Sequence, residues 1–152
     1  MTPYVEGENF AIEINRRVAI ARVYRRPELG PAALEDAARA LLAHAQTLVV
    51  EPIADGMVID LRRAPGAVSE AVATAYATIA RSWEASAQPI AFLIDKESMQ
   101  ALQIMRVVSE HAHRFGLVTS DRDEAHAFAG NGSVPSHSTR RLLWNGFGSV
   151  GS

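Results

Sequence analysis

Two short, continuous apolar runs constrain the fold of this chain more than any other feature. Residues 57–61 have the sequence MVIDL and residues 90–94 have the sequence IAFLI. A strand that is apolar on both sides has to be covered on both faces, as strands of a parallel sheet are. Segments with helical periodicity flank these runs at residues 31–48, 69–83 and 96–115. Strands that alternate with helices predict an α/β fold with a mostly parallel sheet and right-handed crossovers.

A hairpin is predicted before the first helix. Residues 10–15 alternate between apolar and polar side chains, which is typical of a half-buried strand, and residues 15–17 indicate a tight turn into a second strand from Val18. A last strand is expected at residues 116–119 and a last helix at residues 120–129. The predicted order is β-β-α-β-α-β-α-β-α, a mixed and mostly parallel sheet with an N-terminal antiparallel hairpin.

The chain of 152 residues fits one domain. We expect residues 1–7 to form an N-terminal lead and residues 8–129 to form the domain. Residues 130–152 are rich in glycine and serine, which predicts a flexible tail. The sequence leaves open whether Trp144 and Phe147 in this tail pack on the domain, dock on a partner or stay disordered.

Composition excludes several classes of protein. The chain has no cysteine, so disulfides, thiolate metal sites and a cysteine nucleophile are ruled out. Its 15 basic and 17 acidic residues give no general attraction to nucleic acid or anionic lipid. The first residues do not form a secretion signal, and no apolar run approaches the roughly 20 residues of a membrane span. We therefore expect a cytoplasmic protein with no nucleic-acid or membrane partner.

No catalytic motif is found. The phosphate-binding patterns GxGxxG and GxxxxGK[ST] and the hydrolase pattern GxSxG are absent. His111 and His113 are two residues apart on a predicted helix, so they point in different directions and do not bind one metal. The sequence predicts no enzymatic activity, no cofactor and no metal site.

Asp60 and Asp95 each lie at the end of a predicted parallel strand. That edge of an α/β sheet is where ligands bind. Two interpretations stay open. The carboxylates either cap the segments that follow them, or act together as acid and base or as metal ligands.

The order of elements resembles the STAS family of sulfate-transporter and anti-sigma-factor-antagonist domains. Residues 8–129 carry the resemblance. Residues 58–61 resemble the central strand of the family, residues 89–94 the next strand, and residues 115–125 the terminal strand with its acidic cap and last helix. The resemblance implies a STAS-like fold and a bacterial, non-catalytic regulatory or scaffolding module. Its implied partner is another protein, of a kinase-like or sigma-regulatory kind.

One family motif differs in this chain. Regulatory members carry Asp-Ser-Ser-Gly or Asp-Ser-Thr-Gly at the start of the helix after the central strand. Here that stretch falls on residues 68–71, with Ser69 at the first hydroxyl position, Glu70 at the position normally phosphorylated and Ala71 at the glycine. A carboxylate replaces only part of the charge of a phosphate, about −1.5 to −2. Ser69 remains either a phosphate acceptor or a helix cap.

From the resemblance we expect the partner-binding surface on the loop of residues 62–68 and the start of the following helix. The alternative is a small-molecule-binding protein or weak enzyme that uses the strand-end crevice near Asp60 and Asp95. The candidate partner-binding and regulatory residues are Asp60, Arg62, Arg63, Ser69 and Glu70.

Self-association is a further expectation. Either the predicted edge strand of residues 10–15 or the helix with Met99 and Met105 could pair with a second copy and give a homodimer. The sequence does not choose between the two.

Overall fold

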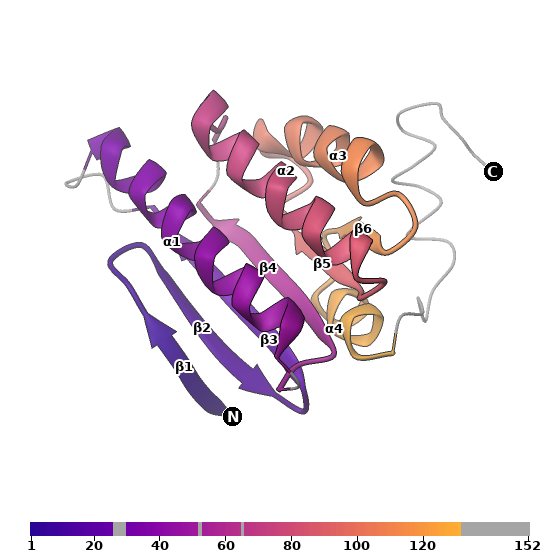
Figure 1. The fold of residues 1–152 in the computed structure, drawn as a ribbon. Helices are drawn as coiled ribbons and strands as arrows, with labels where there is room; N and C mark the ends of the chain where they lie inside the picture. The colour runs from indigo at the N-terminus through magenta and orange to yellow at the C-terminus, as the bar shows by residue number, and fades with distance from the viewer. Residues whose placement is uncertain (26–29, 52, 65, 132–152) are drawn as a thin grey trace.

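The computed structural model describes residues 1–25, 30–51, 53–64 and 66–131, and Trp144 and Phe147 lie outside these residues. Within the described residues, six strands form one sheet and lie in it in the order of the sequence. Helices pack on both faces of this sheet (Figure 1). The predicted α/β class and the mixed, mostly parallel sheet are confirmed.

The antiparallel part of the sheet contains β1 (Thr2–Glu6), β2 (Phe10–Asn15) and β3 (Val18–Tyr24). The predicted hairpin is confirmed, because β2 and β3 pair antiparallel and are joined by a turn of two residues. Arg16 and Arg17 in this turn have φ angles of 51° and 68°. Positive φ at both central residues matches the twist of a two-residue hairpin, although asparagine and glycine adopt it more easily than arginine.

β1 corrects two expectations. The first residues do not form a simple lead, since Thr2–Glu6 pairs antiparallel with β2. β2 therefore lies between β1 and β3, and the expectation that residues 10–15 form an exposed edge is wrong. Pro3 fits this position, because a residue without an N–H is tolerated in an edge strand.

The parallel part of the sheet follows from β3 onward, with one helix in each connection. The additional strands are β4 (Gly56–Arg63), β5 (Ile90–Leu93) and β6 (Gly116–Thr119). The helices are α1 (Gly30–Val50), α2 (Glu70–Ala85), α3 (Gln100–His111) and α4 (Arg122–Asn131). None of the helices in the described residues is both long enough and apolar enough to cross a membrane.

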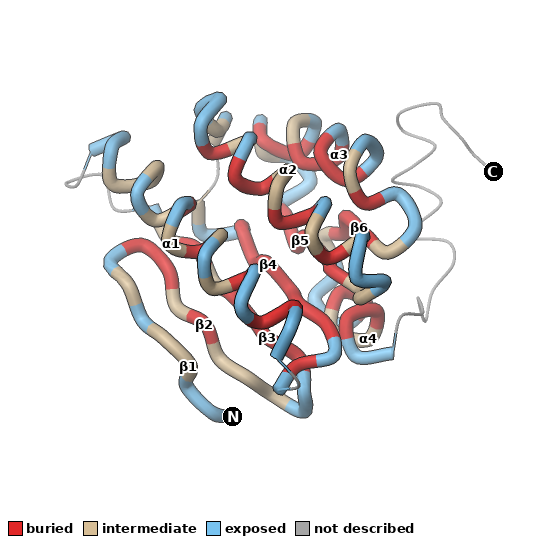
Figure 2. Tube along the Cα trace, viewed as in Figure 1, coloured by how far each residue is buried: buried red, intermediate tan, exposed pale blue. Residues whose placement is uncertain are grey.

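The sheet separates two apolar cores. The larger core lies between the sheet and α1, α2 and α3, and the smaller one lies between the sheet and α4 (Figure 2). β4 contributes side chains to both cores, because successive side chains of a strand point to opposite faces of the sheet. Met57, Ile59 and Leu61 enter the larger core and Val58 enters the smaller one. By the same alternation, the side chains of Asp60 and Arg62 lie on the α4 face.

The third helix is shorter than predicted. α3 begins at Gln100 instead of residue 96 and ends at His111. Met99, which precedes α3, and Leu102 within it are exposed, at 76% and 64%, while Met105 is buried. Of the two methionines named for self-association of this helix, only Met99 is accessible, and the pairing itself stays a prediction.

Arg16→Asn tests the β2–β3 turn. Asparagine tolerates positive φ better than arginine, so we expect the free energy of unfolding to rise by up to about 1 kcal/mol. Arg17 is left in place because its Nε donates to Asp55 Oδ2 at 2.8 Å. Urea denaturation measures the change. Arg16→Ala is the control, and an Arg16→Asn variant no more stable than Arg16→Ala would contradict the turn assignment.

Candidate functional site

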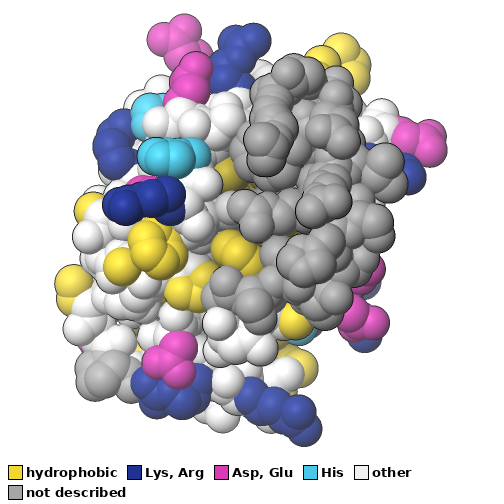
Figure 3. All heavy atoms as spheres, turned by 90° about the vertical axis from the view of Figure 1, so that its right-hand side faces the viewer, with side chains coloured by type: hydrophobic (Ala, Val, Ile, Leu, Met, Phe, Trp, Pro, Cys, Tyr) yellow, Lys and Arg dark blue, Asp and Glu magenta, His cyan; other side chains and the backbone are white. Residues whose placement is uncertain are grey.

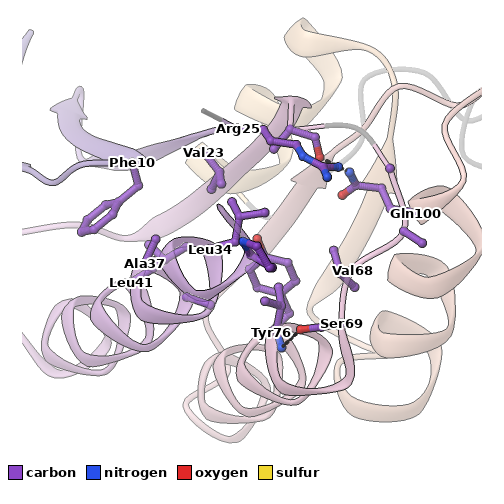
Figure 4. Close-up of a pocket in the computed structure, with 16 residues that line it drawn as sticks. Phe10, Val23, Arg25, Leu34, Ala37, Leu41, Val68, Ser69, Tyr76 and Gln100 are labelled. Carbon is purple, nitrogen blue, oxygen red and sulfur yellow. Dashed lines mark hydrogen bonds between the residues drawn. The ribbon is translucent and has the colours of Figure 1, made fainter. Parts of the chain in front are cut away.

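A pocket lies at the carboxyl-terminal edge of the parallel strands, between α1 and the start of α2. Its volume is about 150 Å³. The close-up in Figure 4 shows that β2, β3, both helices, the loop after β4 and the start of α3 all contribute to it. Most of its walls are apolar, and the larger side chains are those of Phe10, Val23, Leu34, Leu41, Val72 and Tyr76.

Small side chains account for this space. Ala37 and Ala38 of α1 line it on one side, and Ala64, Gly66 and Ala67 line it on the other. Protein interiors are close-packed, with few voids larger than a water molecule, so such a series of short side chains leaves volume that neighbouring side chains do not fill. The edge where the pocket lies is also where α/β sheets generally bind ligands.

The loop that forms one wall is held by α3. The side-chain amide of Gln103 accepts a hydrogen bond from Val68 N at 2.9 Å and donates one to Val68 O at 3.1 Å. Gln100 Nε2 donates to Ala64 O. The loop is thereby fixed at two points, so the wall of the pocket has a defined shape. Neither glutamine was predicted as a site residue, because its partner lies some 35 positions earlier in the chain.

One end of the pocket is polar. Gln100 is 1% exposed, and among the described residues its Oε1 has no hydrogen-bond partner. The guanidinium of Arg25 lies near Gln100 in Figure 4. Ser69 Oγ, also in the lining, accepts a hydrogen bond from Val72 N at 3.2 Å. The polar end of the lining therefore contains a guanidinium and a hydroxyl group, while Gln100 Oε1 is closed off from the open space.

Tyr76 forms part of the apolar wall. Burial raises its pKa far above the ordinary value, so its hydroxyl group stays neutral. Its ring meets Phe92 edge-on at 6.1 Å between centroids. Tyr76 belongs to the core together with Trp83, since they are 3% and 0% exposed.

The sequence-predicted site residues separate into two groups. Ser69 lines the pocket and is the N-cap of α2, which confirms its predicted capping role. Glu70 follows it as an exposed residue in the first turn. Arg63 is exposed at the end of β4. Asp60 and Arg62 lie on the other face of the sheet, so the structure does not bring all five together.

Asp60 is engaged by Arg62. Its Oδ1 accepts hydrogen bonds from Arg62 N at 3.1 Å and Arg62 Nε at 3.0 Å, and its Oδ2 accepts one from Arg62 Nη2 at 2.9 Å. Burial alone would raise the pKa of Asp60, but these hydrogen bonds and the charges of Arg62 and Arg22 outweigh it and lower that pKa. Asp60 is a structural ion-pair partner in this arrangement.

Asp95 has a separate local role. It is exposed, and its Oδ1 accepts a hydrogen bond from Glu97 N at 3.1 Å. The contacts seen among the described residues do not join Asp95 to Asp60, and neither lines the pocket. The structure therefore favours the interpretation in which each carboxylate caps the segment that follows it.

Histidines are dispersed over the described part of the chain. His44 packs against the rings of Tyr4 and Phe10, and His111 lies beside Glu110. Burial, followed by the charge of Arg122, lowers the pKa of His126. Within residues 1–25, 30–51, 53–64 and 66–131, no three His, Cys, Asp or Glu side chains form a group that could hold a metal ion.

The surface beside α3 and α4 carries charges of both signs. Figure 3 views the molecule from the right-hand side of Figure 1 and shows arginine or lysine, acidic and histidine side chains interspersed with apolar ones on the described part of this face. Such a mixture gives no single-sign field to attract a charged polymer.

Comparisons with known proteins do not identify a family for this chain. No model of a known protein family matches it, and neither curated proteins nor solved structures gave a match. The resemblance to the STAS family therefore stays a prediction.

Asp60→Asn tests the ion pair with Arg62. Because the pKa of Asp60 is lower in the folded chain than its ordinary value of 3.8, its carboxylate stabilises the fold above that pH. This contribution is lost as the pH falls through the folded-state pKa. Near neutral pH we expect Asp60→Asn to lower the free energy of unfolding by about 1–3 kcal/mol.

Urea unfolding of both proteins over a range of pH measures this effect. The difference between wild type and Asp60→Asn should narrow as the pH falls below 3.8. Asp95→Asn is the matched control, because its carboxylate is exposed and receives one local hydrogen bond from Glu97 N. If the difference in the free energy of unfolding between wild type and Asp60→Asn stays constant below this pH, the ion pair is not the cause of that difference.

Proposed function

We propose that this chain is a non-catalytic binding module that holds a small, mainly apolar molecule in the pocket between α1 and α2. The observation that carries the proposal is an apolar space of about 150 Å³ with one polar end, at the carboxyl-terminal edge of the sheet. A cavity of about this size in another protein, lined by Leu, Ile and Phe, binds benzene. The pocket therefore matches the body of a small ring or a short branched chain.

Energetics support an occupant. Longer side chains at Ala37 or Ala38 would fill the space from within α1. A ligand that fills it instead recovers the lost packing contacts and removes apolar surface from water.

The chemistry of the lining supports binding without catalysis. Among the described lining residues, Arg25 and Tyr76 are the titratable ones. A guanidinium has no acceptor atom, and burial raises the pKa of Tyr76 so that its hydroxyl group stays neutral. A general base would need a pKa near the working pH.

Ala38→Leu tests this proposal. Ala38 is 4% exposed and lines the pocket, so a leucine at this position fills the space from the wall of α1. Wild type should gain thermal stability with pocket-sized compounds such as benzyl alcohol, toluene and cyclohexanol. At about 100 times its dissociation constant a ligand stabilises by about 2.7 kcal/mol, and Ala38→Leu should lose most of this gain.

The matched control is Ala43→Leu, the same substitution at an exposed position of the same helix. It should respond to the compounds as wild type does. The pocket is not a ligand site if no compound stabilises wild type, or if Ala38→Leu responds as strongly as Ala43→Leu. Thermal unfolding followed by fluorescence or circular dichroism measures all three proteins.

A second candidate function is protein binding at the rim of the same pocket, as the STAS resemblance implies. The observation that favours it is the exposure of Met99 and Leu102, at 76% and 64%. They lie next to Gln100 and Gln103, which hold the loop after β4. Under this proposal the loop of residues 62–68 and the starts of α2 and α3 contact a protein partner, and cytoplasmic signalling is the corresponding role.

The double variant Met99→Ser, Leu102→Ser tests whether this surface binds a protein partner. Removal of two exposed apolar side chains should leave the melting temperature nearly unchanged, because neither belongs to the core. A partner protein captured by wild type should bind this double variant at least tenfold more weakly. Equal affinity of an isolated partner for both proteins would exclude this surface.

Ser69→Ala separates a helix cap from a phosphorylation switch. Loss of the hydrogen bond from Val72 N to Ser69 Oγ should lower the free energy of unfolding by about 1 kcal/mol. Ser69→Asp keeps a capping oxygen and should retain most of the stability. If Ser69→Ala unfolds like wild type in urea while binding to the isolated partner changes, the residue acts in binding instead of capping.

A further inference from the structure

The ring of Phe10 lies between the pocket and a second open space. This second space is a groove of about 320 Å³ between α1 and the connection that joins β1 to β2. The side chains of Phe10 and Ala37 line both the pocket and the groove. Figure 4 shows Phe10 at the end of the pocket that lies away from Gln100 and Ser69. Phe10 therefore forms the end wall of the pocket on the side of the groove.

The residues of α1 show how the two spaces adjoin. One set lines the pocket and comprises Pro31, Leu34, Ala38 and Leu41. The other set lines the groove and comprises Ala33, Asp36, Ala40 and His44. Residues three or four apart share a face of a helix, so the two sets form neighbouring stripes along α1. Ala37 belongs to both sets and has only a methyl group, so the ring of Phe10 supplies most of the barrier between the two spaces.

The ring of Phe10 is held from the groove side. A Cβ atom on Gly7 would lie 2.5 Å from Phe10 Cε1, which leaves no room for a side chain at position 7. The ring centroid of Phe10 lies 6.1 Å from that of His44. Gly7 and His44 line the groove and are not part of the described lining of the pocket. These contacts keep the ring, which is 4% exposed, in place as a wall.

We propose that Phe10 is a specificity-determining residue that limits the length of the bound molecule to about six carbon atoms. This inference rests on the proposed function of the pocket as a ligand site. A cavity of about 150 Å³ holds benzene, and a longer molecule would need the space beyond the ring. Val5 and Ala40 give that space apolar walls, so the ring is what keeps an apolar chain from entering it.

A series of linear primary alcohols tests the inference. Butanol, hexanol and octanol are titrated into the full chain, and dissociation constants are measured by ligand-observed NMR. The hydroxyl group is common to all three and cancels in the comparison. Each methylene that is buried tightens binding about fourfold, so wild type should bind hexanol about tenfold more tightly than butanol. Octanol should bind wild type no more tightly than hexanol, because its last carbons meet the ring of Phe10.

Phe10→Ala removes the wall and joins the pocket to the groove. In this variant octanol should bind about tenfold more tightly than hexanol. Ile12→Ala is the matched control for a loosened core. Ile12 lies on the same strand, is 1% exposed and belongs to the same core as Phe10. It is not part of the described lining of either space, so Ile12→Ala should keep the limit at hexanol.

Gly7→Ala tests the same wall in the opposite direction and leaves the core side chains intact. Its Cβ atom forces the ring of Phe10 away from the groove and toward the pocket. Hexanol should then bind no more tightly than butanol. Circular dichroism checks that each variant is folded, and Gly7→Ala decides the question if Phe10→Ala does not fold.

The outcomes separate this inference from the proposed function. If none of the alcohols binds wild type, the pocket is not a ligand site and both are wrong. If octanol binds wild type clearly more tightly than hexanol, the pocket is a ligand site but Phe10 does not limit the length of its ligand. The role of Phe10 is also wrong if its folded variant and Gly7→Ala both keep the limit of wild type, or if Ile12→Ala moves that limit as Phe10→Ala does.

Discussion

The rest of the structure depends on the burial of β4 on both of its faces. β4 pairs with β3 on one side and β5 on the other, and successive side chains supply two separate cores. α4 packs so closely on this strand that a Cβ on Gly56 would lie 1.8 Å from the carbonyl oxygen of Ala129. A shift of one residue in register would move Asp60 into the larger core and Ile59 out of it. The placement of α1 and α2, and therefore of the pocket between them, follows from this one strand.

Much of the fold could be predicted because its main elements are strongly periodic or continuously apolar. The runs at residues 57–61 and 90–94 correspond to β4 and β5, and Ser69 was correctly placed before α2. β1 could not be predicted in the same way. Its apolar residues Tyr4 and Val5 are adjacent instead of alternating, and a strand of this kind is defined by its pairing with β2. The start of α3 was placed too early for a similar reason, because exposed Met99 has the same apolar character as a core residue.

The candidate site was only partly predictable. Ser69 was identified from its capping chemistry. Alternation along β4 places the side chain of Asp60 on the α4 face of the sheet, opposite the face on which the pocket lies. The pocket itself has no sequence motif, because it arises from missing volume at alanines that lie on α1 and on the loop after β4. Gln100 and Arg25 are 75 positions apart in the chain, and their proximity depends on the order of strands in the sheet. Side chains that meet through tertiary structure leave no spacing pattern for sequence reasoning to detect.

The space between α1 and α2 also determines how the molecule responds to compression. Unfolding under hydrostatic pressure is favoured when water can enter volume that the folded chain leaves empty, and the volume change scales with such voids. The pocket of about 150 Å³ exceeds the water-sized voids that are usual between packed side chains. The space between α1 and α2 is a place where compression can act, whereas the contact of Gly56 with Ala129 on the α4 face leaves no such space. An occupant of the pocket would fill this space and reduce its contribution to the volume change of unfolding.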